Sequence, residues 1–173
     1  MSFLEQGARQ SVRVVLVLLV ALFCTAGAEE APPKGQKLPG SVVALYKAVN
    51  AFRADNGLPP VKLSGKLVKA AMGHSQEMAE LDYFSHTSPT PGQSSCWDRA
   101  EFVGYDWAAL SENIYRSAKT GDDEIAQDTV NVWKSSGNHR ANMLDPKVNE
   151  MGVGVARYPN GEYAVTLMMG REF

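Results

Sequence analysis

The sequence predicts an α+β domain in which helices pack around a small, mainly antiparallel sheet. Between residues 41 and 133, apolar side chains recur every three or four positions, which indicates amphipathic helices. The last quarter instead contains the apolar runs 151–156 and 163–169, which favour strands. The sequence Tyr-Pro-Asn-Gly at 158–161 separates these two runs and predicts the turn of a β-hairpin.

The helical spacing predicts four helices in order along the chain. Ser41 and Ser64 are the expected N-caps of the first two helices, which end near Asn56 and Phe84. Two further helices are expected at 96–103, closed by Gly104, and at 122–133. The prolines and small polar residues of 87–96 predict a loop that borders or covers a site.

The first 28 residues predict a signal peptide that is removed before the domain functions. Arg9 and Arg13 precede an apolar run at 14–23, and small residues at 26–28 resemble a cleavage site. A transmembrane anchor is the competing interpretation, but this run is shorter than the roughly 20 residues that span a bilayer. We therefore expect cleavage near Ala28, no stable transmembrane span, and a secreted, extracellular or periplasmic protein.

The remaining chain predicts one domain at 41–173, preceded by a flexible, proline-bearing lead-in at 29–40. The formal net charge of the chain is −2 and it contains no basic block, so nucleic acid is not an expected partner. Outside the signal segment Cys96 is the single cysteine, which excludes an intramolecular disulfide in the mature protein. Packing must therefore stabilise the domain.

Three polar residues, His86, Glu112 and His139, are the candidate site. Each lies in a short polar, turn-like segment that follows or interrupts an apolar stretch, as expected of side chains presented to a cleft. Two imidazoles and a carboxylate can hold a divalent metal, relay a proton or bind a polar ligand. On the residues alone, a purely structural role for the three is an equal alternative. His74 lies on the apolar stripe of the second helix and is expected to be packed and hydrogen-bonded.

A succession of short motifs resembles one known family. These motifs are Leu58-Pro59-Pro60, Phe84-Ser85-His86, Gly104-Tyr105, Ser111-Glu112-Asn113-Ile114, Trp133-Lys134-Ser135-Ser136, Gly137 to Leu144, and Gly152-Val153-Gly154-Val155. In order and spacing they resemble the CAP superfamily, also called SCP domains, which includes cysteine-rich secretory, antigen-five and pathogenesis-related proteins and short bacterial members. The resemblance implies a three-layer α-β-α sandwich, export, and a central cleft containing a His-Glu-Glu-His tetrad.

Matched residue by residue, the resemblance assigns three tetrad positions to His86, Glu112 and His139. The second glutamate of the tetrad is replaced here by Ser136. A missing carboxylate lowers the negative charge offered to a divalent ion. We therefore expect no required cofactor, with His86 and His139 as the candidate ligands of a divalent metal such as zinc.

Three classes of function remain open on this resemblance. The first is a secreted module that binds a small lipid-like or sterol-like ligand, or an unknown extracellular or envelope partner. The second is a peptidase-like hydrolase or divalent-metal-dependent activity with His86 or His139 as general base, oriented by Glu112. The third is a structural protein of the cell envelope. Ser136 lies in no nucleophile-elbow motif, so we rank binding or interaction above enzymatic activity.

The signal segment gives a first testable prediction. Protein recovered from its host is expected to begin at Glu29 or within a few residues of it, because the small residues at 26–28 precede that position. Intact-mass measurement with amino-terminal sequencing checks this. A product that retains Met1 would contradict cleavage.

Overall fold

The computed structural model describes residues 38–173, so the predicted signal segment and most of the lead-in lie outside the described residues. Within this range the chain forms five helices and four strands. In chain order these are α1 (Gly40–Asp55), β1 (Lys62–Leu63), α2 (Gly65–Glu80), α3 (Cys96–Phe102), β2 (Trp107–Ser117), α4 (Asp122–Ser135), α5 (Gly137–Met143), β3 (Glu150–Arg157) and β4 (Tyr163–Glu172). No helix in this range is long and apolar enough to cross a membrane.

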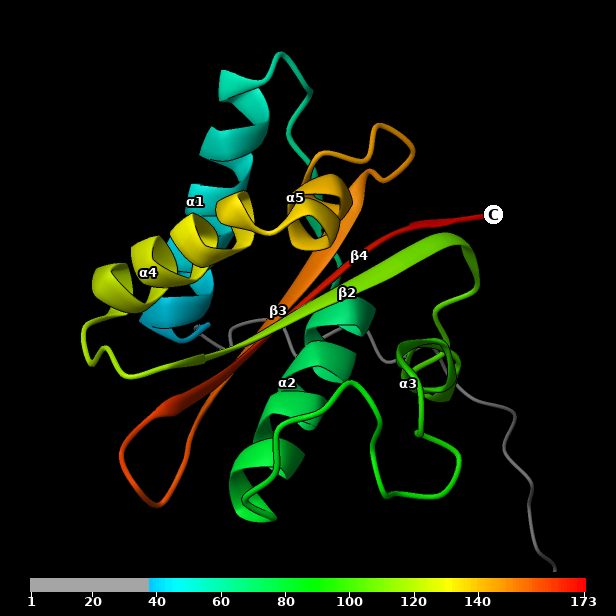
Figure 1. The fold of residues 1–173 in the computed structure, drawn as a ribbon. Coiled ribbons are helices and arrows are strands. Elements are labelled where there is room, and N and C mark those ends of the chain that lie inside the picture. The colour runs from blue at the N-terminus through cyan, green and yellow to red at the C-terminus, as the bar shows by residue number, and fades with distance from the viewer. Residues whose placement is uncertain (1–37) are drawn as a thin grey trace, which may run out of the picture. The chain divides into compact units, whose positions relative to one another are not determined.

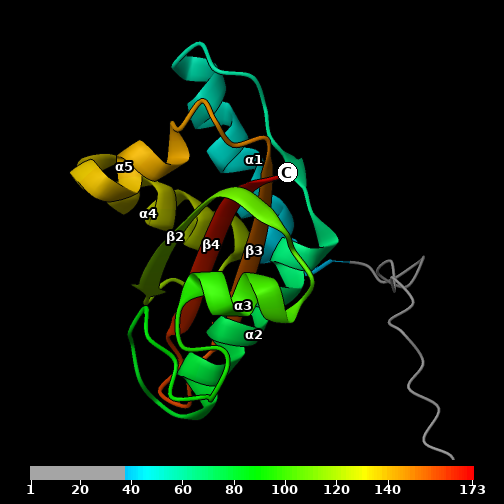
Figure 2. The ribbon, with the colours of Figure 1, turned by 90° about the vertical axis from the view of Figure 1, so that its right-hand side faces the viewer.

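The elements form three layers around one sheet. The strand order is β1-β3-β4-β2, with β4 antiparallel to both neighbours and the short β1 parallel to β3. Helices α1, α4 and α5 lie on one side of the sheet, and α2 and α3 lie on the other (Figures 1 and 2). This arrangement confirms the expected α+β class and the three-layer α-β-α sandwich.

Strand β4 is central and supplies apolar side chains to both layers. Val165, Leu167 and Met169 belong to the core beneath α1 and α4, whereas Met168 packs with Leu67 of α2 on the other side. This alternation follows from the two-residue period of a strand. The buried character of β4 on both faces explains why its sequence is a nearly continuous apolar run.

Two glycines of β3 let α2 lie directly on the sheet. A Cβ atom at Gly152 would lie 2.0 Å from the carbonyl carbon of Leu67, and one at Gly154 would lie 2.1 Å from the carbonyl oxygen of Ala71. No real side chain tolerates such distances, so the strand needs glycine at both positions. The close contact sets the position of α2 and of the loop that follows it.

The predicted hairpin is confirmed, since β3 and β4 pair antiparallel around the turn at 158–162. The prediction that Ser41 caps the first helix is wrong, because α1 begins at Gly40 with Pro39 as its N-cap and Ser41 is buried. Ser64 is the N-cap of α2, but its side chain makes no capping hydrogen bond. The short helix predicted at 96–103 is present as α3, and Gly104 follows it with a positive φ.

Two segments expected to be turn-like are regular elements instead. Glu112 lies in the middle of β2, where Glu112 and Asn113 are buried polar residues that interrupt the apolar pattern of a strand. His139 lies inside α5, because Gly137 begins a second short helix rather than ending the segment. Distant residues bond to both segments: His86 and Arg99 to the Glu112 carboxylate, and Asn113 to the backbone oxygen of His139.

The contact between β3 and α2 gives a stability prediction. Gly154→Ala is expected to lower the free energy of unfolding by about 3 kcal/mol, because its methyl group would overlap the α2 backbone. Gly137→Ala is the matched control, since no heavy atom lies within 4 Å of its Cβ position. The control is expected to change stability by no more than about 0.5 kcal/mol. Urea denaturation measures both, and equal stabilities of the two variants would contradict the packing argument.

Candidate functional site

His86 and Glu112 are in direct contact. His86 lies in the loop after α2, and Glu112 is opposite Met168 in the β2–β4 ladder, so its side chain faces the α2 layer. The distance from His86 Nδ1 to Glu112 Oε1 is 2.8 Å. Because an ionised carboxylate only accepts hydrogen bonds, Nδ1 carries the hydrogen and the Nε2 of a neutral ring is an acceptor. The His86 side chain is 55 % exposed and that of Glu112 is 2 % exposed.

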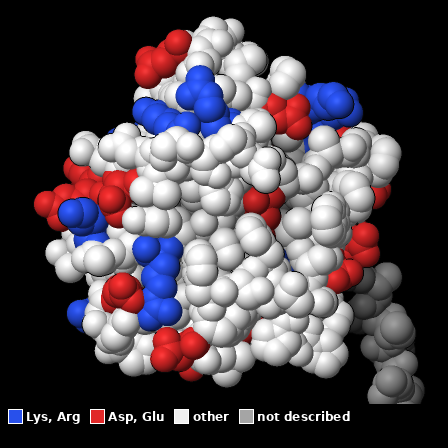
Figure 3. All heavy atoms as spheres, viewed as in Figure 1, with Lys and Arg blue, Asp and Glu red and all other residues white. Residues whose placement is uncertain are grey.

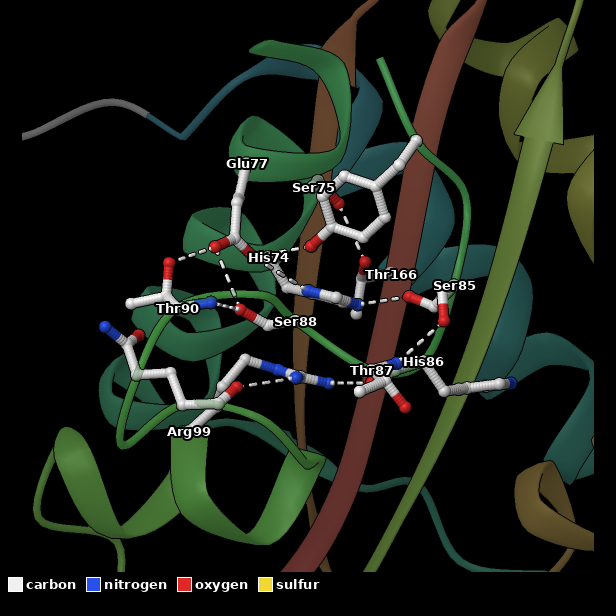
Figure 4. Close-up of polar contacts among 12 residues, drawn as sticks. His74, Ser75, Glu77, Ser85, His86, Thr87, Ser88, Thr90, Arg99 and Thr166 are labelled. Carbon is white, nitrogen blue, oxygen red and sulfur yellow. Dashed lines mark hydrogen bonds and ion pairs between the residues drawn. The ribbon is translucent and has the colours of Figure 1, made fainter. Parts of the chain in front are cut away.

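Arg99 of α3 holds Glu112 from the other side. Its Nη2 donates to Glu112 Oε2 at 2.6 Å, and both side chains are 2 % exposed. The same guanidinium donates to the backbone carbonyls of Gln93, Ser94 and His86. Figure 4 shows Arg99 beneath the loop that carries His86. One buried cation therefore joins α3, the 86–94 loop and β2.

The surroundings keep Glu112 ionised. Burial raises the pKa of this carboxyl group, but the hydrogen bond from His86 and the charge of Arg99 outweigh burial, and its pKa lies below the ordinary value. Both carboxylate oxygens have a partner, Oε1 in His86 and Oε2 in Arg99. Glu112 therefore orients His86 rather than offering a free oxygen to a ligand.

His139 is connected to this pair through Asn113. The Asn113 amide donates to the backbone oxygen of His139 at 3.0 Å, and Asn142 donates to Asn113 Oδ1 at 2.8 Å and to the Glu112 backbone oxygen at 3.3 Å. The His139 ring lies beside Trp133, with ring centroids 6.4 Å apart. Burial lowers the pKa of His139, and so does the charge that His86 carries whenever it is protonated, which favours a neutral His139 ring.

The structure thus joins His86 to Glu112 directly, while His139 is held through its backbone. The Nδ1 atom of His139 is buried and has no hydrogen-bond partner within residues 38–173. Ser136 is the N-cap of α5, and its side chain makes no capping hydrogen bond. His74 is buried as expected, with its Nε2 2.9 Å from the backbone oxygen of Ser85.

Sequence reasoning missed Arg99. An arginine in a short helix is ordinarily solvent-exposed, and its burial here depends on Glu112, which lies on a strand that was not predicted. The capping box of α3, in which Ser95 and Asp98 bond reciprocally, is a sequence signal that places the N-cap of the helix four residues before Arg99. Trp97, in the first turn of α3, is 48 % exposed.

The donor set does not form a complete metal site. In the part of the chain that the structure describes, no group of three or more His, Cys, Asp or Glu side chains is placed to hold a metal ion. Two imidazoles remain, and both oxygens of Glu112 are already bonded. Structural and catalytic zinc sites use three or four protein ligands. The residues present therefore do not fit a tightly held metal.

Comparison with known proteins relates the chain to one family. The model of the cysteine-rich secretory protein family (CAP) matches residues 46–169. Protein YkwD of Bacillus subtilis is 35 % identical over 137 residues, which cover 73 % of this chain and 51 % of YkwD. The chain thus spans about half the length of that relative.

Solved structures of similar fold include an extracellular SCP-domain protein from Bacillus anthracis, at 27 % identity and a TM-score of 0.63. This match covers 77 % of this chain and 41 % of that one. The crystal structure of NaASP2 with Zn²⁺ is also similar, at 14 % identity and a TM-score of 0.57, covering 82 % of this chain and 84 % of that one. At 14 % identity the latter likeness concerns the fold alone.

The buried ion pair predicts strong coupling between Arg99 and Glu112. Arg99→Met is expected to lower the free energy of unfolding by about 3–5 kcal/mol, because it leaves a buried carboxylate without its cation. Combining it with Glu112→Gln should cost less than the sum of the two single changes. Chemical denaturation of the four proteins measures this coupling. Additive effects would contradict it, and Arg171→Met, at an exposed arginine, is the control for loss of an arginine.

The buried histidine predicts acid sensitivity. Burial lowers the pKa of His74 in the folded protein, opposed by the charge of Glu112. Below the ordinary histidine pKa of about 6.5, the unfolded chain therefore binds this proton more readily, and stability falls as the pH falls from there toward the folded pKa. The pKa of His139 is also lowered in the folded protein, so this residue contributes to the same fall in stability.

His74→Gln should flatten the fall in unfolding free energy between about pH 7 and pH 5.5, a range above the ordinary carboxyl pKa values. Denaturation at a series of pH values measures the slope. Because His139 contributes separately, a His139→Gln protein is the comparison, and the double variant should be flatter than either. A wild-type slope in all three variants would contradict the assignment.

Proposed function

This chain belongs to the cysteine-rich secretory protein (CAP) family, and on that basis we propose that it is an exported module that binds a small ligand. Its binding surface is the one around His86, Glu112 and His139. Export is supported by the basic residues and apolar run before Ala28. It is also supported by the likeness to an extracellular SCP-domain protein.

The observation that carries the proposal is the hydrogen bond between His86 and Glu112. The 2.8 Å bond holds the imidazole in one orientation, and the 55 % exposure of His86 leaves its Nε2 open to solvent. An oriented, uncharged acceptor is suited to a hydroxyl or N–H group of a ligand. The buried Arg99 neutralises the charge of Glu112, so the pair does not demand a cationic ligand.

Two exposed aromatic side chains that are close in sequence to site residues favour a ligand that is otherwise apolar. Phe84, two residues before His86, is 45 % exposed, and Trp97, two residues before Arg99, is 48 % exposed. In Figure 3 the middle of the face that is drawn is mostly uncharged, while charged side chains gather toward its margins. A sterol-like or other hydroxyl-bearing lipid combines the one polar group and the apolar body that such a surface binds.

A hydrolase is the second candidate, and the same His86–Glu112 pair favours it. A carboxylate that orients a histidine with an open Nε2 is the base half of a catalytic triad. Such a base would activate a water molecule. The absence of a hydroxyl nucleophile bonded to the His86 ring within residues 38–173 ranks this candidate second.

Ligand binding is expected to depend on the His86 ring. Purified protein should take up radiolabelled cholesterol from detergent solution with saturation, and His86→Phe should weaken binding by about tenfold, which corresponds to about 1.4 kcal/mol. Phenylalanine keeps an aromatic ring but removes the acceptor nitrogen. Lys119→Gln, at an exposed residue, is the control and should bind like the wild type.

Equal binding by the wild type and His86→Phe would contradict the proposed site. Native mass spectrometry of protein prepared without chelators or metal-affinity resin provides a second measurement, in which a retained lipid supports the module. Because the NaASP2 structure includes Zn²⁺, elemental analysis should accompany it. Stoichiometric zinc, or turnover of an ester or peptide that is lost in His86→Phe, would favour the second candidate.

A further inference from the structure

A polar pocket lies beside Arg99. It has a volume of about 290 Å³ and lies between α2 and the loop that precedes α3. Its walls include Gly73, His74 and Glu77 of α2 together with Thr90, Gln93 and Arg99. Figure 4 shows His74, Glu77, Ser88 and Thr90 grouped above Arg99. None of these residues takes part in the ligand site proposed above except Arg99, which contacts both.

Glu77 supplies a negative charge to this pocket. Three hydroxyl groups donate to its carboxylate: those of Tyr83 at 2.5 Å, Ser88 at 2.8 Å, and Thr90. Burial raises the pKa of Glu77, but these hydrogen bonds outweigh burial, and its pKa lies below the ordinary value. Because every donor is a neutral hydroxyl, the carboxylate keeps its full charge, and no cation within residues 38–173 is hydrogen-bonded to it.

His74 places a second acceptor beside this carboxylate. Its Nε2 is 2.9 Å from the Ser85 carbonyl oxygen, which only accepts, so Nε2 carries the hydrogen and Nδ1 of the neutral ring has a lone pair. Nδ1 lies 3.7 Å from Glu77 Oε2 and has no hydrogen-bond partner in the described part of the chain. The His74 side chain is fully buried. Two acceptors thus face each other with no donor between them, which is unfavourable for buried groups.

Gly73 provides an independent indication that this wall is kept open. A glycine inside a helix costs about 1 kcal/mol relative to alanine. Here no heavy atom lies within 4 Å of the position that its Cβ would occupy, and its φ is not positive. Neither packing nor backbone conformation therefore requires glycine at this position in α2. The missing side chain leaves space along the wall of the pocket.

We propose that this pocket binds a small ligand through a primary ammonium group placed between Glu77 and His74. Since Oε2 and Nδ1 are 3.7 Å apart, one nitrogen can lie at about 2.9 Å from both. An ammonium group has three N–H donors and a positive charge, so it satisfies the unpaired Nδ1 and the carboxylate together. Hydroxyl donors alone leave that charge uncompensated.

Arg99 indicates where the rest of the ligand lies. Its Nε is buried and has no hydrogen-bond partner within residues 38–173, although both Nη atoms are bonded. As Arg99 lines the same pocket, its Nε–H and the Gln93 amide offer donors to a ligand acceptor such as a carboxylate. A volume of 290 Å³ is about that of ten water molecules, which matches an amino acid or the amino terminus of a peptide.

Glycine and betaine distinguish an ammonium site from a general cation site. Both carry a positive nitrogen and a carboxylate, but the trimethylated nitrogen of betaine has no N–H donor. In ¹⁵N–¹H NMR titrations of the purified protein near pH 7.5, glycine should produce saturable shifts in residues 73–77 and 88–93, and betaine should not. Glycinamide, which lacks the carboxylate, distinguishes two kinds of natural ligand. If it binds as strongly as glycine, the ligand is the amino terminus of a peptide. If it binds more weakly, the ligand is a free amino acid.

Two variants test the pocket itself. Glu77→Gln keeps the shape of the side chain and should weaken glycine binding at least about tenfold. Gly73→Met should block binding by filling the open space, whereas Gly73→Ala should retain binding and raise the melting temperature. The Gly73 pair decides the matter if Glu77→Gln does not fold.

Three results would overturn the proposal: no saturable shift with glycine in the wild type, equal binding of betaine, or unchanged binding in Gly73→Met. None of them bears on cholesterol binding at His86, so the two proposals fail separately.

Discussion

The buried ion pair between Arg99 and Glu112 is the interaction on which the arrangement of the site depends. Removing both charges from water is costly, and the pair is tolerated because a 2.6 Å hydrogen bond and further donors and acceptors surround it. Arg99 also bonds three loop carbonyls, so a single guanidinium determines where the His86 loop lies relative to β2. A lysine has one nitrogen and could not make this set of contacts.

Arg99 also contributes to two polar regions. Its Nη2 donates to Glu112, and the Arg99 residue also lines the pocket that contains His74 and Glu77. The charges of Glu112 and Arg99 both affect the proton affinity of His74, in opposite directions. Arg99 is therefore the charged group that the two polar regions share.

The local sequence pattern predicted those parts of the fold in which apolar residues are buried and polar residues are exposed. The hairpin of β3 and β4 was predictable because its strands are apolar and its turn contains glycine. Strand β2 was missed because buried Glu112 and Asn113 break its apolar pattern, and their partners come from α3 and α5. For the candidate site, the sequence identified His86 and Glu112 as candidate residues. Their contact, and the role of Arg99, follow only from tertiary structure.

The position of β2 at the edge of the sheet has a consequence for association between molecules. The carbonyls of an outer strand can template the addition of a strand from another chain. Here the backbone oxygen of Glu112 accepts from Asn142 of α5, and that of Ile114 accepts from the Trp133 indole of α4 at 3.2 Å. These two carbonyls belong to alternate residues of β2, point away from β4, and accept hydrogen bonds from side chains. The helices beside the site thus protect the middle of this edge from the pairing that begins β-aggregation.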